Sequence, residues 1–354
     1  MNLDHNKTYA TLDATDIRFG IEHLPEQIRI AWHETRELIL PESFRRASNI
    51  VVAGMGGSAL GSHMLATAFS DRLSVPISIV NDYHLPACVT KKTLVILSSF
   101  SGTTEEVLAC SFEAEKIGAM IVVIASGGEL AKRATKKKWP LYQFDPGELA
   151  RQPRMGTGFS LAGVLGILER ARLMKISDAE IDRMVIAMDE VIDTCAVDVP
   201  AKENPAKTVA KSMKDSVVFL IAAEHLVGVS HMFTNCIHET AKQFAVHFPL
   251  PELNHHLLEG LTYPKSFSSK AVAFMMQSSL YSERIQKRIV VTADSLERQG
   301  LTVIDYEAHG TDRLEEVGEM LQFASFVAYY MAMQNGVHPE EIPFVDAFKK
   351  EMAK

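Results

Sequence analysis

Short runs of Val, Ile and Leu alternate with amphipathic stretches along the first 150 residues of the chain. The runs are too short for core helices and are typical of strands buried on both faces of a parallel sheet. The predicted strands are Asn49–Ala53, Ile77–Val80, Leu94–Leu97, Met120–Ala125 and a short one near Tyr142. The predicted helices between them are Ser58–Phe69, Thr104–Lys116 and Glu129–Lys137. This alternation predicts βαβ units and a doubly wound parallel sheet.

The second half of the chain repeats this order, so we infer an internal duplication at the level of the fold. Its predicted strands are Val217–Ala222, Ala271–Met276 and Leu301–Tyr306, and its predicted helices are Ala206–Lys214, Ser230–Phe244 and Ser282–Arg298. Further helices are expected in Thr15–Leu40, Ser160–Met174, Asp178–Thr194, Glu315–Gln334 and Phe344–Met352. We therefore predict two flavodoxin-like α/β domains, residues 1–150 and 205–310, joined by a helical linker, 151–204, and followed by C-terminal helices, 311–354. The apolar face of Glu315–Gln334 indicates core or a dimer interface.

Composition narrows the class of protein. The 354 residues are 47% hydrophobic and 23% charged, with a net charge of −8, which is typical of a globular chain. The acidic balance and the lack of a basic stripe argue against a nucleic-acid surface. Four cysteines, Cys88, Cys110, Cys195 and Cys236, are expected to be buried free thiols of a reducing compartment. Without a signal peptide or an apolar run of membrane length, we expect a cytoplasmic protein.

Two strand-to-helix breaks carry the candidate chemistry. In NIVVAGMGGSALG (residues 49–61), three glycines, Gly54, Gly56 and Gly57, permit close approach of the backbone to a ligand. In LVILSSFSGTTEE (residues 94–106), the hydroxyl residues are Ser98, Ser99, Ser101, Thr103 and Thr104. The two helix N-termini would lie side by side at one sheet edge and attract an anion. Because neither break contains Lys or Arg, the site suits the phosphate of a small, hydroxyl-rich molecule.

Two alternatives apply to the first break. Residues 54–59 also fit the G-x-G-x-x-A fingerprint of dinucleotide-binding folds, and Asp82 follows the next strand, where a ribose contact would lie. The glycines could also serve only a tight turn and close packing. The hydroxyl-rich second break favours a sugar phosphate, because a pyrophosphate site needs the first turn alone. A P-loop is excluded, since no Gly-Lys-Ser/Thr follows.

Six motifs occur in one order: GMGGSALG, SSFSGTTEE, QPRMG (152–156), HETAK (238–242), PELNHH (251–256) and VDAFK (345–349). This order resembles the bifunctional phosphoglucose/phosphomannose isomerase family, built from two sugar-isomerase (SIS) domains. The resemblance implies an aldose–ketose isomerase of carbohydrate metabolism (glycolysis and gluconeogenesis) that acts on glucose 6-phosphate, fructose 6-phosphate and mannose 6-phosphate through a cis-enediol. It also implies a homodimer without cofactor, metal, nucleic-acid or membrane partners.

The resemblance assigns roles to individual residues. Glu239 would be the base, Arg154 the cation for the enediolate, His255 the ring-opening acid/base supplied by the neighbouring subunit, and Lys349 an aid to ring opening. The phosphate would be held by Gly56, Gly57, Ser58, Ser99, Ser101 and Thr104. The chain departs from the family pattern in three places: His256-Leu257 after His255, Thr103, and His231-Met232-Phe233.

Local patterns leave other interpretations of these residues. Helical spacing would place His238 beside Lys242 and turn Glu239 another way, as in a surface helix. Six histidines crowd residues 225–256, but none of them form the paired spacing with a third ligand that zinc requires, so no metal is expected. A sugar-phosphate-binding regulator without turnover and a nucleotide-dependent oxidoreductase remain alternative functions.

Overall fold

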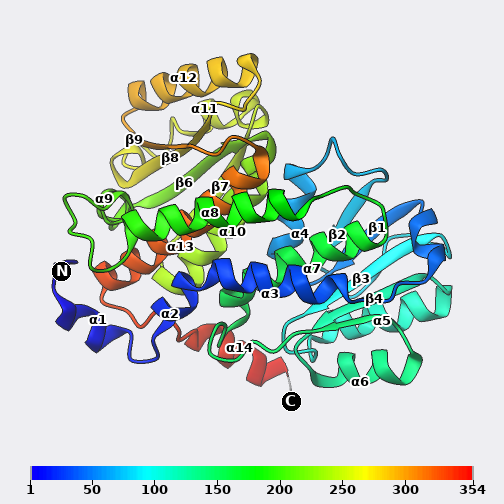
Figure 1. Ribbon diagram of the computed structural model, residues 1–354. Coiled ribbons are helices and arrows are strands. Elements are labelled where there is room, and N and C mark those ends of the chain that lie inside the picture. Colours follow the sequence, from blue (N-terminus) through cyan, green and yellow to red (C-terminus); the bar gives the residue numbers. More distant parts are fainter. Residues whose placement is uncertain (1, 353–354) are drawn as a thin grey trace.

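The computed structural model describes residues 2–352 and contains two parallel β-sheets, each within an α/β unit (Figure 1). The first sheet has the order β2-β1-β3-β4-β5, and the second has the order β7-β6-β8-β9. The strands are β1 (Asn49–Ala53), β2 (Ile77–Val80), β3 (Thr93–Ser99), β4 (Met120–Ala125), β5 (Leu141–Gln143), β6 (Val217–Ala223), β7 (Ala245–Leu250), β8 (Ala271–Ser278) and β9 (Thr302–Ala308). The predicted fold class, two parallel-sheet α/β domains, is confirmed.

Helices cover both faces of the first sheet, and the long helix α13 packs between the second sheet and α8 (Figure 1). In the first half they are α1 (Asn6–Leu12), α2 (Ile17–Glu22), α3 (Leu24–Arg36), α4 (Gly57–Ala68), α5 (Glu105–Ile117), α6 (Gly128–Lys137) and α7 (Thr157–Arg170). In the second half they are α8 (Asp178–Cys195), α9 (Pro205–Met213), α10 (Val227–Cys236), α11 (Leu257–Gly260), α12 (Glu283–Arg298), α13 (Arg313–Asn335) and α14 (Pro343–Met352).

The alternating side chains of β1 and β3 enter two different cores. Ile50 and Leu94 belong to the large core that also includes α4, α7 and the second unit, whereas Val51 and Val95 pack with α5 and α6. Alternation arises because successive strand residues point to opposite faces. The near-continuous apolar runs of the sequence therefore reflect a sheet buried on both sides.

Helix α13 lies inside the molecule. Every residue from Leu314 to Gln334 is buried within the chain itself. Of the two interpretations of this stretch, core or dimer interface, the core is confirmed. Its apolar surface consequently offers no support for a dimer.

Strand β7 was missed by the sequence prediction, which extended one helix from Ser230 to Phe244. In the structure α10 ends at Cys236, a π-helical turn follows over Ile237–Ala241, and β7 pairs in parallel with β6. His247 and Pro249 interrupt the apolar run of β7, and proline is tolerated there because β7 is an edge strand. With β7 included, the order β7-β6-β8-β9 matches β2-β1-β3-β4, which strengthens the inference of an internal duplication.

The cysteine prediction holds for three of the four thiols. Cys110, Cys195 and Cys236 are buried, but Cys88 is exposed, so its expected burial was wrong. All four are free. Among the helices that the structure describes, none is both long and apolar enough to cross a bilayer.

Candidate functional site

The two predicted turns lie next to each other at the carboxyl edge of the first sheet. Strands β1 and β3 pair directly, with Ala53 opposite Leu97, and α4 and α5 begin four and six residues after their strands. Gly56 is exposed and has φ 48°, a conformation that side-chain-bearing residues rarely adopt. The unpaired N–H groups at both helix starts therefore face the same edge.

Several hydroxyls of the turns are buried and bind one another. Ser58 Oγ accepts a hydrogen bond from the Phe100 N–H at 2.8 Å, and Ser98 Oγ donates to the Ser58 carbonyl at 2.8 Å. Ser99 Oγ lies 2.8 Å from Thr104 Oγ1. These contacts tie the first turn to the second and fix their relative position.

Other hydroxyls remain open to a ligand. Ser101 is exposed, with its Oγ 2.8 Å from Thr103 Oγ1, and Thr104 is half-buried at the start of α5. Ser98 and Ser99, predicted within the break, instead form the last two residues of β3. The hydrogen-bond donors that remain accessible at this edge of the sheet are thus Ser101, Thr104 and the backbone around Gly56.

Arg154 lies directly behind the first turn. It belongs to a short 3-10 helix, Pro153–Gly156, that packs against Gly57. A Cβ built on Gly57 would lie 2.4 Å from the Pro153 carbonyl oxygen, so only glycine permits this approach. The sequence motif around Gly57 and the QPRMG motif, about a hundred residues apart, therefore share one wall.

The structure brings Arg154 and Glu239 together across the two halves of the chain. Arg154 Nη1 lies 3.5 Å from Glu239 Oε2, and the arginine side chain is 1% exposed whereas that of the glutamate is 31% exposed. Burial lowers the pKa of Arg154, and the nearby Glu239 carboxylate opposes that shift. Because an arginine remains charged in proteins, the pair joins a buried cation to an accessible carboxylate.

Lys242 lies close to this pair, and the predicted contact between His238 and Lys242 was wrong. Residues 237–241 form a π-helical turn, and Lys242 follows with φ 53°, which removes it from the helix. His238 Nε2 instead lies 2.8 Å from the Ala245 carbonyl. Burial, with a smaller effect of Arg154, lowers the pKa of Lys242 to about 8. Sequence reasoning gave Lys242 no role, because its neighbours in space come from a distant segment.

The structure shows no hydrogen bond or ion pair that joins His255 or Lys349 to the pair within residues 2–352, although Asp346, three residues before Lys349 on α14, influences the pKa of Arg154. His255 and Lys349 are both exposed. Asn254, before His255, turns toward α12 and donates to Thr292 Oγ1 at 2.8 Å. Lys349 belongs to α14, which has no buried residue in its described length.

A row of three histidines connects the two halves, and the sequence prediction missed its first member. The rings of His63 on α4 and His231 on α10 have centroids 4.4 Å apart, and His247 on β7 stacks on His231 at 5.1 Å. Burial lowers the pKa of all three, that of His231 to about 4. Among residues 2–352, no group of three or more His, Cys, Asp or Glu side chains is arranged to hold a metal ion.

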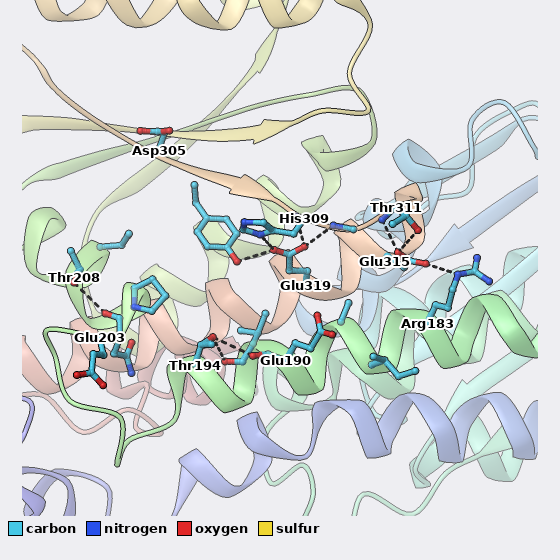
Figure 2. Close-up of a pocket in the computed structure, with 18 of the residues that line it drawn as sticks. Arg183, Glu190, Thr194, Glu203, Thr208, Asp305, His309, Thr311, Glu315 and Glu319 are labelled. Carbon is cyan, nitrogen blue, oxygen red and sulfur yellow. Dashed lines mark hydrogen bonds and ion pairs between the residues drawn. The ribbon is translucent and has the colours of Figure 1, made fainter.

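Figure 2 shows a separate hollow of about 970 Å³ between α8, α9, β9 and the start of α13. Glu315 accepts hydrogen bonds from Thr311 and pairs with Arg183, and Glu319 accepts from the Tyr306 hydroxyl. Carboxylates outnumber cations in this lining. The hollow is therefore a poor site for a phosphate.

Comparison with known proteins agrees with the fold and the motifs. Residues 202–352 match the family model of the bacterial phospho-glucose isomerase C-terminal SIS domain. A bifunctional phosphoglucose/phosphomannose isomerase of Caldicellulosiruptor bescii is 27% identical over 95% of this chain and 98% of its own length. The enzyme of the same name from Thermoplasma acidophilum is 28% identical over 88% and 92%.

Solved structures support the fold. A hypothetical protein from Thermus thermophilus superposes with a TM-score of 0.76 at 17% identity, covering 98% of this chain and 92% of that one. The C-terminal domain of glucosamine-fructose-6-phosphate aminotransferase from Francisella tularensis superposes with a TM-score of 0.70 at 12% identity, covering 91% and 97%. The chain is thus a homologue of the bifunctional phosphoglucose/phosphomannose isomerases, and its C-terminal half contains an SIS domain.

Proposed function

We propose that the protein is an aldose–ketose isomerase that interconverts glucose 6-phosphate and fructose 6-phosphate and also accepts mannose 6-phosphate. The observation that carries the proposal is the pairing of buried Arg154 with accessible Glu239, 3.5 Å apart, behind an uncharged anion-binding turn. The names of the homologous enzymes support the same substrates.

The phosphate would bind at the helix starts. Hydrogen bonds would come from backbone N–H groups near Gly56 and Gly57 and from the hydroxyls of Ser101 and Thr104. The positive ends of the α4 and α5 dipoles would also attract the anion. Ser58 and Ser99, which bind within the protein, hold these donors in place. Anchoring the phosphate leaves the reacting carbons free to reach the second half of the chain.

The proton transfer would use the paired side chains. After ring opening, the Glu239 carboxylate removes the proton from C2 of the aldose and returns it to C1, so one base serves both carbons of a cis-enediol intermediate. Arg154 donates to the oxygen on which negative charge develops. His255 and Lys349 are candidates for moving the proton of the ring oxygen. Such a reaction requires no redox cofactor.

A coupled assay of Glu239→Gln tests the assignment. Removing the base is expected to lower kcat by about 10²- to 10⁴-fold, whereas Glu129→Gln, on the remote helix α6, serves as the control. Wild-type turnover in Glu239→Gln would refute the role of Glu239. Thermal protection by fructose 6-phosphate without any turnover would instead favour the regulator, and protection by NADH would favour the oxidoreductase.

We also propose that the active form is a homodimer in which His255 reaches the site of its partner. The exposure of His255 supports this arrangement, as does the lack, among residues 2–352, of a hydrogen bond or ion pair between it and Arg154 or Glu239. Mixing two inactive variants, Glu239→Gln and His255→Ala, would create hybrid dimers with one intact site each. Statistical exchange would then restore about a quarter of wild-type activity, whereas sites contained within one chain would restore none.

A further inference from the structure

A segment between α13 and α14, residues 336–342, contacts both Arg154 and Lys242, and we call it the C-terminal strap. Arg154 Nη2 donates to the carbonyls of Pro339 at 2.8 Å and Glu340 at 2.6 Å. Lys242 Nζ donates to the carbonyls of His338 at 2.6 Å and Pro339 at 3.3 Å. Together the two cations hold three consecutive backbone carbonyls and share that of Pro339.

These contacts determine which nitrogen of the Arg154 guanidinium faces Glu239. With Nη2 engaged by the strap, Nη1 is the nitrogen that faces Glu239 at 3.5 Å. Within the described residues, Nη1 and Nε are buried and have no hydrogen-bond partner. A buried donor without a partner is costly unless something binds it during function. The strap thus leaves one donor of Arg154 available beside the carboxylate.

We propose that Lys242 is a positioning residue of the isomerase: it fixes the strap, and the strap orients Arg154 toward the reacting oxygen. The inference rests on the proposed function and adds a residue to it. Asn335 ties the start of the strap to the same region, because its Nδ2 donates to the Ala241 carbonyl and to Gln243 Oε1 on either side of Lys242. The residue that precedes the strap is therefore tied to both neighbours of Lys242.

The hydrogen bonds from Lys242 to the strap, which we call the clamp, depend on pH because Lys242 can lose its charge. The charged or titratable groups around it are Arg154 on the 3-10 helix, Glu239 on the π-helical turn, and His338, Glu340 and Glu341 on the strap. Hydrogen bonds from an ammonium are stronger than those from a neutral amine. Because burial lowers the pKa of Lys242 to about 8, the clamp weakens as pH rises through that value.

Kinetics of Lys242→Met and Lys242→Arg test the proposal, with Lys211→Met on the exposed surface of α9 as the control. Lys242→Met should lower kcat about tenfold or more, as a misplaced catalytic group does, with KM for fructose 6-phosphate changed less than about threefold because the phosphate turns are untouched. Lys242→Arg should retain activity and lose the decline of activity near pH 8, because arginine does not titrate there. Lys211→Met should match the wild type.

Amide hydrogen exchange supplies a readout independent of turnover. The amides of His338, Glu340, Glu341 and Ile342 should exchange faster in Lys242→Met than in the wild type. In the wild type they should also exchange faster, after correction for intrinsic rates, above pH 8. The inference would be overturned if Lys242→Met had the same kcat, the same pH profile and the same exchange rates as the wild type. Absence of hexose-phosphate turnover in the wild type would overturn the proposed function instead, and unchanged exchange would still refute the clamp.

Discussion

Replacing Gly57 with alanine tests whether α4 sets the position of Arg154. The added Cβ would lie 2.4 Å from the Pro153 oxygen, 2.6 Å from its carbonyl carbon and 2.8 Å from the Arg154 nitrogen, all of them backbone atoms. Ordinary van der Waals contact begins near 3.4 Å, so the 3-10 helix must retreat by about 1 Å. Overpacking of this kind costs about 1–3 kcal/mol of stability, and a displacement of 1 Å can lower catalysis about a hundredfold.

Gly61→Ala is the matched control, because it lies one turn further along the same helix. Its Cβ would lie 2.4 Å from the Leu161 nitrogen on α7, which is an equal overlap away from Arg154. Thermal unfolding and steady-state kinetics are measured for both variants. We expect similar decreases in Tm, but a loss of about a hundredfold in kcat only for Gly57→Ala. Equal kcat values in the two variants would refute the argument that Gly57 positions the arginine.

Two further predictions concern the histidine row and the tie between the turns. The pKa values of His63, His231 and His247 are lowered in the folded state, so unfolding favours protonation and stability should fall as pH drops from about 6.5 toward 4; urea unfolding at several pH values checks this, and a flat profile would contradict it. Ser58→Ala removes the acceptor of the Phe100 N–H. It should cost about 1 kcal/mol and raise KM for fructose 6-phosphate, and an unchanged KM would separate Ser58 from phosphate binding.

The strands and the turns that follow them could be predicted from sequence because their causes are local. The strands Asn49–Ala53, Ile77–Val80 and Met120–Ala125 were predicted to the residue, since apolar runs bounded by glycine or polar residues mark buried parallel strands. The glycine spacing likewise reflects local requirements of the backbone: a positive φ at Gly56 and a close approach of Pro153 at Gly57. Both features depend on a few neighbouring residues.

The contact between Arg154 and Glu239 could not be predicted from local pattern. By its local pattern Glu239 looks like a helix-surface glutamate. Only the resemblance connected it with Arg154 before the structure placed the two side chains 3.5 Å apart. The strap is harder still, because Arg154 and Lys242 bind its backbone carbonyls, which every sequence possesses. The departure from α-helical geometry at residues 237–241 also has no local periodic signal.

The matching strand orders of the two sheets raise the question of why the first domain, and not the second, would bind the phosphate. In the second domain the turn after β6 carries Glu224, whose carboxylate accepts from Ser282 N–H at 3.2 Å and Ser282 Oγ at 2.7 Å at the start of α12. Ser282 precedes α12 as Thr104 precedes α5, so the two residues occupy corresponding helix starts in the two domains. A carboxylate already satisfies the donors there and repels an anion. The two sheets thus differ in charge at this turn, and the turn at Gly56, where we propose that the phosphate binds, carries no carboxylate.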